Sequence, residues 1–464
     1  MRGKVREVVA SGPDHPRGAV STAVDPVAGV TATIARAVGQ VRAGLRDPLL
    51  RGGYALVANT LATAVLGLAY WIAAARLFSP LEVGRGSAAI NLMNLLASVA
   101  GLNLAAAMAF LLPQLGRSTM GYVARAYLAS TAIALVLVVP LLAVVVTGHH
   151  VPGVRDVPRL VLALLVVGVP ASAVFTLQDG VLVGLRRAPL VLLENSAFGV
   201  AKLLLLPAVA IGGIAGGIFT TWLVPLLAAV VVVNIVVFGR LVPAASHRPD
   251  VLALSRDAVR RFVGINYLGS MLYQAYFAVL PLLVLVELGA RANGLFYVAW
   301  VFASSLDLLA HSMASTMVVE GSADPGRLGA LTAQVCKRLA VIVLPIVLVV
   351  LVAAPLVLSI YGRAYAEASS GVLRLLVLAA IPRTLVIVVQ SAARARGRAH
   401  TTLWTEGLTC GCVLGTAAVL LPVLGPFGIG VAWLAANVVV LGAVSGPLVR
   451  LLRRPRPAPA TATS

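Results

Sequence analysis

Apolar residues along this chain form long runs, and polar residues gather in short segments between them. From Tyr54 onward each apolar run is about 20 residues long, enough for a helix to cross the roughly 30 Å hydrocarbon core of a bilayer. Twelve spans are expected, at about 53–76, 86–112, 121–147, 158–179, 190–211, 217–239, 262–288, 294–319, 337–360, 371–393, 401–422 and 427–449. The pattern predicts an all-α polytopic membrane protein with twelve transmembrane helices.

Composition and charge agree with this prediction and fix an orientation. Hydrophobic residues make up 60% of the chain and charged residues 11%, which excludes a water-soluble protein. An even number of spans puts both termini on one side, and if that side is the cytoplasm, 27 of the 36 Lys and Arg residues lie in cytoplasmic segments, as the positive-inside rule requires. The net charge of +20 is then explained by orientation and contact with membrane lipids, so no nucleic-acid partner is expected. Aromatic residues near span ends are expected to form interfacial belts: Trp71, Tyr361, Tyr365 and Trp404.

The chain divides into two lobes with polar segments around them. The predicted parts are a flexible basic cytoplasmic tail (1–48), an N-lobe of helices one to six (49–240), a basic cytoplasmic linker (241–261), a C-lobe of helices seven to twelve (262–452) and a disordered C-terminal tail (453–464). The linker is the longest and most basic connection between spans, as expected between two lobes.

Residues at matching places in the two lobes recur at an offset of 211–212 positions. The matching pairs are Pro170 and Pro382, Gln178 and Gln390, Arg187 and Arg398, Glu194 and Glu406, and Trp222 and Trp433. Because six is an even number of helices, both lobes have the same orientation, and the internal repeat is parallel with its axis along the membrane normal. Such a repeat favours alternating access, in which one lobe rocks against the other around a central cavity.

Basic residues within the spans are the first candidates for substrate binding. Lys202 and Arg383 each lie about twelve residues into a span and therefore near the middle of the membrane. A charge there costs at least about 2.5–3.5 kcal/mol on insertion scales, so a functional role is the default interpretation. The two cations, with Arg374 nearer the outer surface, are predicted to bind an anionic group such as a phosphate. The alternative is that each is paired internally or extends along its helix to the surface.

Asp307 and His311 form an i, i+4 pair on one face of the eighth span. A carboxylate beside a titratable imidazole is predicted to couple transport to a cation gradient. The alternative is a hydrogen-bonded pair that holds helices together.

Amide and acidic side chains supply further candidates. Asn91 and Asn94 share one face of the second span, where amides suit sugar hydroxyls, although they also join helices in lipid. Gln178 and Asp179 lie where the fourth span approaches the cytoplasm and are candidates for a gate. Polar residues are also tolerated near an interface without any function.

Motifs typical of enzymes are missing from the sequence. There is no Gly-rich phosphate-binding loop followed by Lys and Ser or Thr, and no His, Cys or carboxylate group with metal-ligand spacing. The three cysteines form no disulfide framework. We therefore expect no catalytic residues, no metal and no cofactor, and a transporter rather than an enzyme.

Three segments stand out between or beside the spans: ARLFSPLEVGRGSA at 75–88, QDGVLVGLRRA at 178–188 and its counterpart ARARGR at 393–398. They resemble segments of the Wzx-type oligosaccharide and polysaccharide flippases of the multidrug/oligosaccharidyl-lipid/polysaccharide (MOP) exporter superfamily. The resemblance covers about residues 48 to 452 and rests on the order of these loose motifs together with the two-lobe plan.

This resemblance implies a MATE-like bundle that flips polyprenyl-pyrophosphate-linked oligosaccharide from the cytoplasmic to the outer leaflet of a bacterial plasma membrane. Lys202, Arg383 and Arg374 would then meet the pyrophosphate. Partners implied are the lipid-linked oligosaccharide, a polysaccharide polymerase and glycosyltransferases. Two alternatives stay open: a cation-coupled multidrug antiporter of the same superfamily, and a membrane-embedded glycan polymerase or transferase.

Overall fold

The computed structural model describes residues 48–147, 158–214, 216–247 and 256–452. These residues are overwhelmingly helical and contain no strand. The two predicted tails, apart from Pro48, and the middle of the predicted linker lie outside the described residues.

The first half of the chain forms helices that overlap the predicted spans. They are α2 (Pro48–Leu77), α3 (Pro80–Gly101), α4 (Leu104–Leu111), the 3-10 turn η1 (Leu112–Gln114), α5 (Thr119–Thr147), α6 (Arg159–Gly184), α7 (Ala188–Ile211), α8 (Gly217–Val236), the π-helical turn η3 (Val237–Leu241) and α9 (Val242–Ser246). A full capping box begins α3, where the Ser79 side chain accepts from the backbone of Glu82 and the Glu82 carboxylate accepts from the Ser79 N–H.

The second half contains one very long helical element and five ordinary ones. They are α10 (Arg256–Ala323), the turn η4 (Pro325–Arg327), α11 (Leu328–Ser359), α12 (Arg363–Leu378), α13 (Ala380–Ala395), α14 (Ala399–Leu424) and α15 (Pro426–Leu452). Helices α12 and α13 together form one span.

The element α10 is a hairpin of two crossings. Its backbone leaves the helical region at Gly289, where φ is 84°. The Tyr273 hydroxyl donates to the Asp307 carboxylate at 2.9 Å, although a straight helix would separate these residues by about 50 Å. The chain therefore reverses at Gly289, and we call the two arms α10a (256–288) and α10b (290–323).

The number of crossings agrees with the sequence prediction. Ten helices of the described chain are long and apolar enough to span a membrane, and the pair α3 and α4–η1, bent by 48°, makes eleven. Counting α10a and α10b separately gives twelve. The predicted fold class, an all-α membrane protein with two six-helix lobes, is confirmed.

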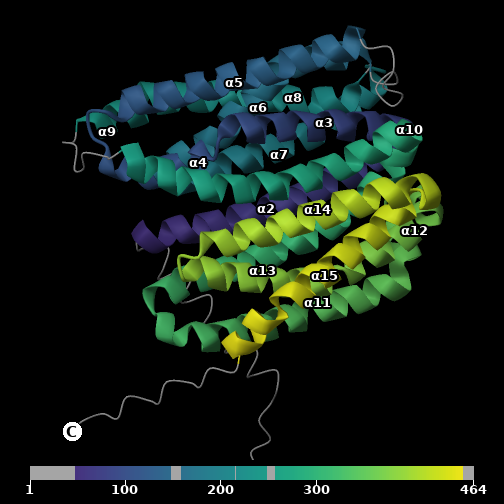
Figure 1. The fold of residues 1–464 in the computed structure, drawn as a ribbon. Coiled ribbons are helices and arrows are strands. Elements are labelled where there is room, and N and C mark those ends of the chain that lie inside the picture. The colour runs from purple at the N-terminus through teal and green to yellow at the C-terminus, as the bar shows by residue number, and fades with distance from the viewer. Residues whose placement is uncertain (1–47, 148–157, 215, 248–255, 453–464) are drawn as a thin grey trace, which may run out of the picture. The chain divides into compact units, whose positions relative to one another are not determined.

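The lobes meet mainly through α3 and α10, which run side by side (Figure 1). A Cβ atom on Gly84 of α3 would lie 1.7 Å from the carbonyl oxygen of Ala290, and one on Gly294 of α10b would lie 1.9 Å from that of Pro80. The two clashes are related by the internal repeat. The Asn293 amide also donates to the Gly84 carbonyl at 2.9 Å. The lobes therefore touch backbone to backbone at a pair of glycines.

The repeat extends to the hydrogen bonds that end α6 and α13. Both helices finish in a Schellman motif, with Arg186 and Gly397 in the left-handed conformation (φ 59° and 70°) at the same place. The bonds are Arg187 N to Leu182 O (2.8 Å) and Arg186 N to Val183 O (2.9 Å) in the N-lobe, and Arg398 N to Ala393 O and Gly397 N to Arg394 O (both 2.9 Å) in the C-lobe.

The predicted aromatic belt is mostly wrong. Trp71, Tyr361 and Tyr365 are buried, with 4%, 2% and 2% of their surface exposed, and only Trp404 is exposed. Trp71 packs against the rings of other aromatic residues, Tyr70, Trp222 and Tyr297. Position near the end of a span does not distinguish a ring that faces lipid from one that faces the protein.

Candidate functional site

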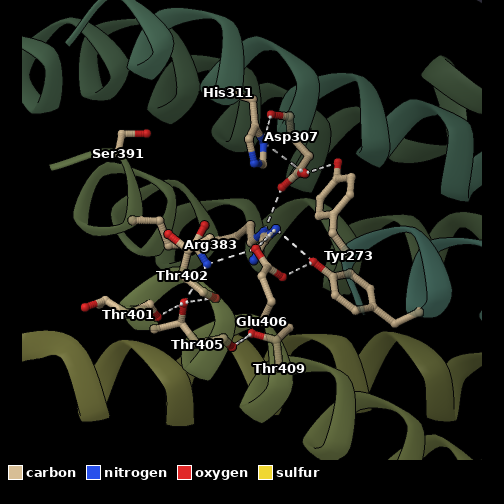
Figure 2. Close-up of polar contacts among 12 residues, drawn as sticks. Tyr273, Asp307, His311, Arg383, Ser391, Thr401, Thr402, Thr405, Glu406 and Thr409 are labelled. Atoms are coloured by element: carbon tan, nitrogen blue, oxygen red, sulfur yellow. Dashed lines mark hydrogen bonds and ion pairs between the residues drawn. The ribbon is translucent and has the colours of Figure 1, made fainter. Parts of the chain in front are cut away.

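A buried arginine lies at the centre of a polar network in the C-lobe (Figure 2). Arg383 of α13 is 1% exposed. Its Nε donates to Asp307 Oδ1 of α10b at 2.9 Å, and its Nη2 donates to the Tyr276 hydroxyl of α10a at 2.9 Å and lies 3.5 Å from Glu406 Oε1 of α14. Four helical segments thus contribute one charged or polar group each, and the guanidinium is paired inside the protein.

The two carboxylates have further partners. The Tyr276 hydroxyl donates to Glu406 Oε2 at 2.8 Å, and the Gln390 amide donates to Glu406 Oε1 at 2.9 Å. The Tyr273 hydroxyl donates to Asp307 Oδ2. Buried charges need such pairing to offset their desolvation. We call this group the C-lobe charge network: Tyr273, Tyr276, Asp307, His311, Arg383, Gln390 and Glu406.

His311 connects the network to a cavity. Its Nδ1 lies 3.0 Å from the Asp307 carbonyl oxygen and 3.4 Å from Asp307 Oδ2, and a quarter of its side chain is exposed. The predicted pair is therefore present, with the ring close to the carboxylate. His311 also lines a cavity of about 400 Å³ together with Asn103, Tyr273, Arg394 and Glu406.

A second cavity of about 150 Å³ adjoins the first, because Asn103 and Ser270 line both. Its walls come from α3, α4 and α6 of the N-lobe and from α10a of the C-lobe, so we call the two the inter-lobe cavities. The smaller cavity is lined by no charged side chain; its polar groups are those of Ser98, Asn103, Thr176, Tyr267, Ser270 and Gln274.

Arg394 is the arginine that lines the larger inter-lobe cavity. Its Nη2 donates to the Ser391 hydroxyl at 2.9 Å, and its Nε is buried without a hydrogen-bond partner among the described residues. Arg383 also has one nitrogen, Nη1, without a hydrogen-bond partner among the described residues, but it pairs with two carboxylates, whereas the hydrogen bond of Arg394 goes to a neutral hydroxyl.

Lys202 of α7 has entirely different surroundings from Arg383. It is 6% exposed, and its Nζ lies 3.6 Å from the ring centroid of Trp222, 4.8 Å from that of Phe198 and 5.1 Å from that of Tyr70. Three rings hold this ammonium by cation–π interactions. The structure therefore gives the two predicted mid-membrane cations separate partners, aromatic in one lobe and acidic in the other.

Three other predicted binding residues have partners within the protein. The Asn91 amide donates to the Ser87 carbonyl of its own helix at 2.9 Å. Asn94 Oδ1 accepts from the Ser172 hydroxyl of α6 at 3.2 Å. Arg374 Nε donates to the Leu351 carbonyl of α11 at 2.9 Å. The contacts of Asn94 and Arg374 join helices, and binding roles for these residues remain predictions.

The predicted gate residues lie at the end of α6 near the side on which α2 begins, which we call the terminal side. Gln178 donates to the Val230 carbonyl of α8 at 3.3 Å, and both Asp179 oxygens lie 3.3 Å from the Asn195 amide of α7. These bonds lie within the N-lobe, and a gating role stays a prediction.

The opposite side is joined by an arginine that the sequence analysis did not select. Arg76, at the end of α2, donates from Nε to the Ile360 carbonyl and from Nη2 to the Ser359 carbonyl, both at 2.7 Å. The acceptors belong to the end of α11 in the other lobe. The inter-lobe cavities, in contrast, are lined by the terminal-side ends of α3, α10a, α13 and α14.

Sequence reasoning also missed most of the charge network. Tyr276, Gln390 and Glu406 were not selected as site residues, although the structure joins all three to one another or to Arg383. The available signal was the match between Glu406 and Glu194 and between Gln390 and Gln178, which placed both residues at equivalent positions without revealing their partners.

Comparisons with known proteins bear on the fold. No protein-family model matches the sequence, and no curated protein is similar enough to count as a relative. The structure is similar to an inward-facing multidrug resistance MATE family transporter of the MOP superfamily, with a TM-score of 0.61 and 16% identity over 84% of this chain and 95% of that one.

Two more solved structures give the same result. One is a MOP superfamily transporter from Pyrococcus furiosus, described as having a binding pocket of reverse polarity that suggests a different function (TM-score 0.60, 16% identity, 88% of this chain and 97% of that one). The other is a MATE protein in complex with MaL6 (TM-score 0.58, 15% identity, 88% and 97%). At this level of identity the likeness establishes the fold: this chain is a multi-pass membrane protein with the two-lobe MATE fold.

Proposed function

We propose that this protein is an alternating-access transporter that flips a lipid-linked oligosaccharide from the cytoplasmic to the outer leaflet of a bacterial plasma membrane. The observation that carries the proposal is the lining of the inter-lobe cavities by amides and hydroxyls. These groups both donate and accept hydrogen bonds, as sugar hydroxyls require. Arg394 adds a guanidinium suited to a phosphate group.

The arrangement of the lobes supports movement between two states. Arg76 joins α2 to α11 on the side opposite the termini, while the cavities lie toward the terminal side. This is the form expected to load substrate from the cytoplasm, given the predicted orientation. The Gly84–Gly294 contact lets the two backbones approach closely, and the hydrogen bonds from Tyr267 to the Val99 carbonyl and from Asn293 to the Gly84 carbonyl lie along the same α3–α10 contact, so rocking is expected about this contact.

Coupling to a cation gradient is assigned to Asp307 and His311. The imidazole lines the larger cavity and lies 3.4 Å from Asp307, so a proton arriving in the cavity has a short path to the charge network. A change of charge on Asp307 would alter its pairing with Arg383. Asp307→Asn is therefore expected to weaken the dependence of transport on the gradient, and a variant with unchanged dependence would remove Asp307 from this role.

The decisive experiment is a flipping assay in proteoliposomes that contain a polyprenyl-pyrophosphate-linked saccharide. Arg394→Gln is expected to lower the flipping rate at least tenfold, because one charge-assisted bond to phosphate is worth about 1.5–3 kcal/mol. Arg327→Gln, an exposed arginine in η4 that lines neither cavity, is the matched control. Absence of flipping by the folded wild-type protein would contradict the proposal.

A second candidate function is a cation-coupled multidrug antiporter. It is favoured by a cavity of about 410 Å³ among α6, α7 and α8, whose lining is apolar except for Glu194. Both Glu194 oxygens are buried and have no hydrogen-bond partner among the described residues. An apolar pocket with one carboxylate suits a hydrophobic organic cation. Efflux of a cationic dye that Glu194→Gln abolishes, without flipping of saccharide, would establish this function.

A further inference from the structure

The turn between α6 and α7 holds an arginine in a conformation that arginine rarely adopts. Arg186 has a φ of 59°, one of three positive values among the described non-glycine residues. The equivalent turn of the C-lobe has Gly397 in this place, the residue that accepts a left-handed backbone without steric strain. Glycine would accept this backbone at a lower energetic cost, and the side chain of Arg186 is what distinguishes this turn from its C-lobe equivalent.

A cavity of about 130 Å³ adjoins this turn. Arg186 and Arg187 line it on one side, and Leu112, Leu115 and Leu241 contribute apolar walls. No acidic side chain lines the cavity, so neither guanidinium has a carboxylate partner there. A cavity with two arginines and no anion is suited to binding an external anion.

The start of α7 adds to the positive character of this place. The helix begins at Ala188, its N-cap Arg187 makes no side-chain cap, and its first turn contains no acidic residue. Pro189 has no N–H and the Leu190 N–H donates to the Arg187 carbonyl at 2.8 Å, so the start of α7 contributes chiefly the partial positive charge of the helix dipole. Two arginines and a helix N-terminus thus come together beside one cavity.

The position of the cavity indicates the source of the anion. It lies at the terminal side of the N-lobe, among η1, the end of α6, η3 and α9, which the charge pattern of the sequence assigns to the cytoplasmic membrane surface. That leaflet carries anionic phospholipids. A soluble phosphate offers the same charge but leaves the leucine walls without a partner.

We propose that this Arg186–Arg187 pocket binds the phosphate of an anionic phospholipid, with the upper part of the lipid tail against the three leucines. The proposal does not depend on what the protein transports.

The test is a thermal unfolding titration of the full chain in detergent with phosphatidylglycerol, and with phosphatidylcholine as the lipid control. Arg186→Gly places in the N-lobe the residue that the C-lobe already has, so the variant without lipid is expected to be as stable as the wild type or more so. Its affinity for phosphatidylglycerol, read from the stabilisation, is expected to be about fivefold weaker. Arg187→Gln is expected to weaken binding similarly, and Arg327→Gln to leave it unchanged.

Two outcomes would overturn the proposal. If phosphatidylglycerol stabilises wild type and Arg186→Gly equally at all concentrations, the pocket does not bind it. If inorganic phosphate stabilises the wild type as well as the lipid does, and Arg186→Gly loses both effects, the site belongs to a soluble phosphate.

Discussion

The two lobes have equivalent glutamates with opposite surroundings. In the C-lobe, Glu406 accepts hydrogen bonds from Tyr276 and Gln390 and pairs with Arg383. In the N-lobe, Glu194 has no hydrogen-bond partner among the described residues and instead faces an apolar cavity.

A few side chains explain this difference. Ala171 occupies the place that Arg383 has in the C-lobe, 212 positions later. Gln178 matches Gln390 but donates to the Val230 carbonyl of α8. Tyr70, which packs on Trp222 as Tyr276 packs on Trp433, directs its hydroxyl to Thr221 at 2.8 Å instead of to a glutamate.

The comparison shows that the lobes share their backbone turns and a tyrosine packed on a matching tryptophan but not their polar chemistry. The ring centroids of Tyr70 and Trp222 are 5.4 Å apart, and those of Tyr276 and Trp433 are 5.6 Å apart. On this common frame, one lobe has an ion-paired network and the other a caged lysine with an unpaired glutamate. Chemistry that needs several coordinated charges is thus concentrated in the C-lobe.

The largest expected effect comes from Arg383→Ala, which gives the C-lobe the residue of the N-lobe. Two buried carboxylates then lose their cation, and a loss of about 3–5 kcal/mol of stability is expected. Thermal unfolding of the purified protein measures it. The triple variant with Asp307→Asn and Glu406→Gln is expected to recover part of the loss. A single variant as stable as wild type would show that the arginine does not balance these charges.

Substitution of the two glutamates tests the comparison directly. Glu406→Gln is expected to lower stability by about 1.5–3 kcal/mol because it weakens bonds to Arg383 and Tyr276. Glu194→Gln removes no hydrogen bond and replaces a buried carboxylate without a partner by a neutral amide, so stability is expected to stay the same or to rise. Unfolding of both variants under the same conditions gives the difference, and equal effects would contradict the asymmetry of the lobes.

The contact between the lobes is expected to be symmetric. Gly84→Ala and Gly294→Ala each place a methyl group against a carbonyl oxygen of the other lobe, and each is expected to lower stability by about 1–3 kcal/mol. Gly67→Ala is the control, because a Cβ there meets nothing within 4 Å. Thermal unfolding measures the loss of stability of each variant, and the flipping assay measures its transport activity. A strong effect of only one of the two would show that the contact is not shared equally.

The smallest expected loss of stability concerns the caged lysine. Lys202→Met keeps the apolar stem and removes the ammonium, so stability is expected to fall by about 1 kcal/mol through loss of cation–π contacts. The transport activity of this variant distinguishes a structural role of Lys202 from a role in substrate binding. A large loss of flipping with little change in unfolding would assign Lys202 to substrate binding, as the sequence analysis predicts, whereas unchanged flipping would leave it a structural residue.

The fold was largely predictable because the membrane imposes it. Every backbone polar group in lipid must be paired within the protein, so runs of about 20 apolar residues can only be helices. The matches between Pro170 and Pro382 and between Trp222 and Trp433 then gave the two lobes. Both inferences use features that can be read directly from the sequence, namely the length of apolar runs and the spacing of matching residues.

The candidate site was less predictable because its contacts connect distant parts of the chain. Asp307 and His311 were found as a local pair, four residues apart. Arg383 was found as a buried charge, but its partner Glu406 lies one helix away and its partner Tyr276 more than 100 residues away. The direction in which each side chain points depends on how its helix is rotated about its own axis. In an almost uniformly apolar helix the sequence does not show which face is turned toward the protein.

The Arg76 contact with α11 has a consequence for how this protein can vary. Both acceptors are main-chain carbonyls, so replacement of the side chains at Ser359 and Ile360 leaves the hydrogen bonds available. Natural substitution can therefore change these two hydrogen bonds directly at position 76, but not through the side chains at 359 and 360. Homologues with lysine or an uncharged residue there are expected to differ in how long the side opposite the terminal side stays shut, even where every residue of the cavities is the same.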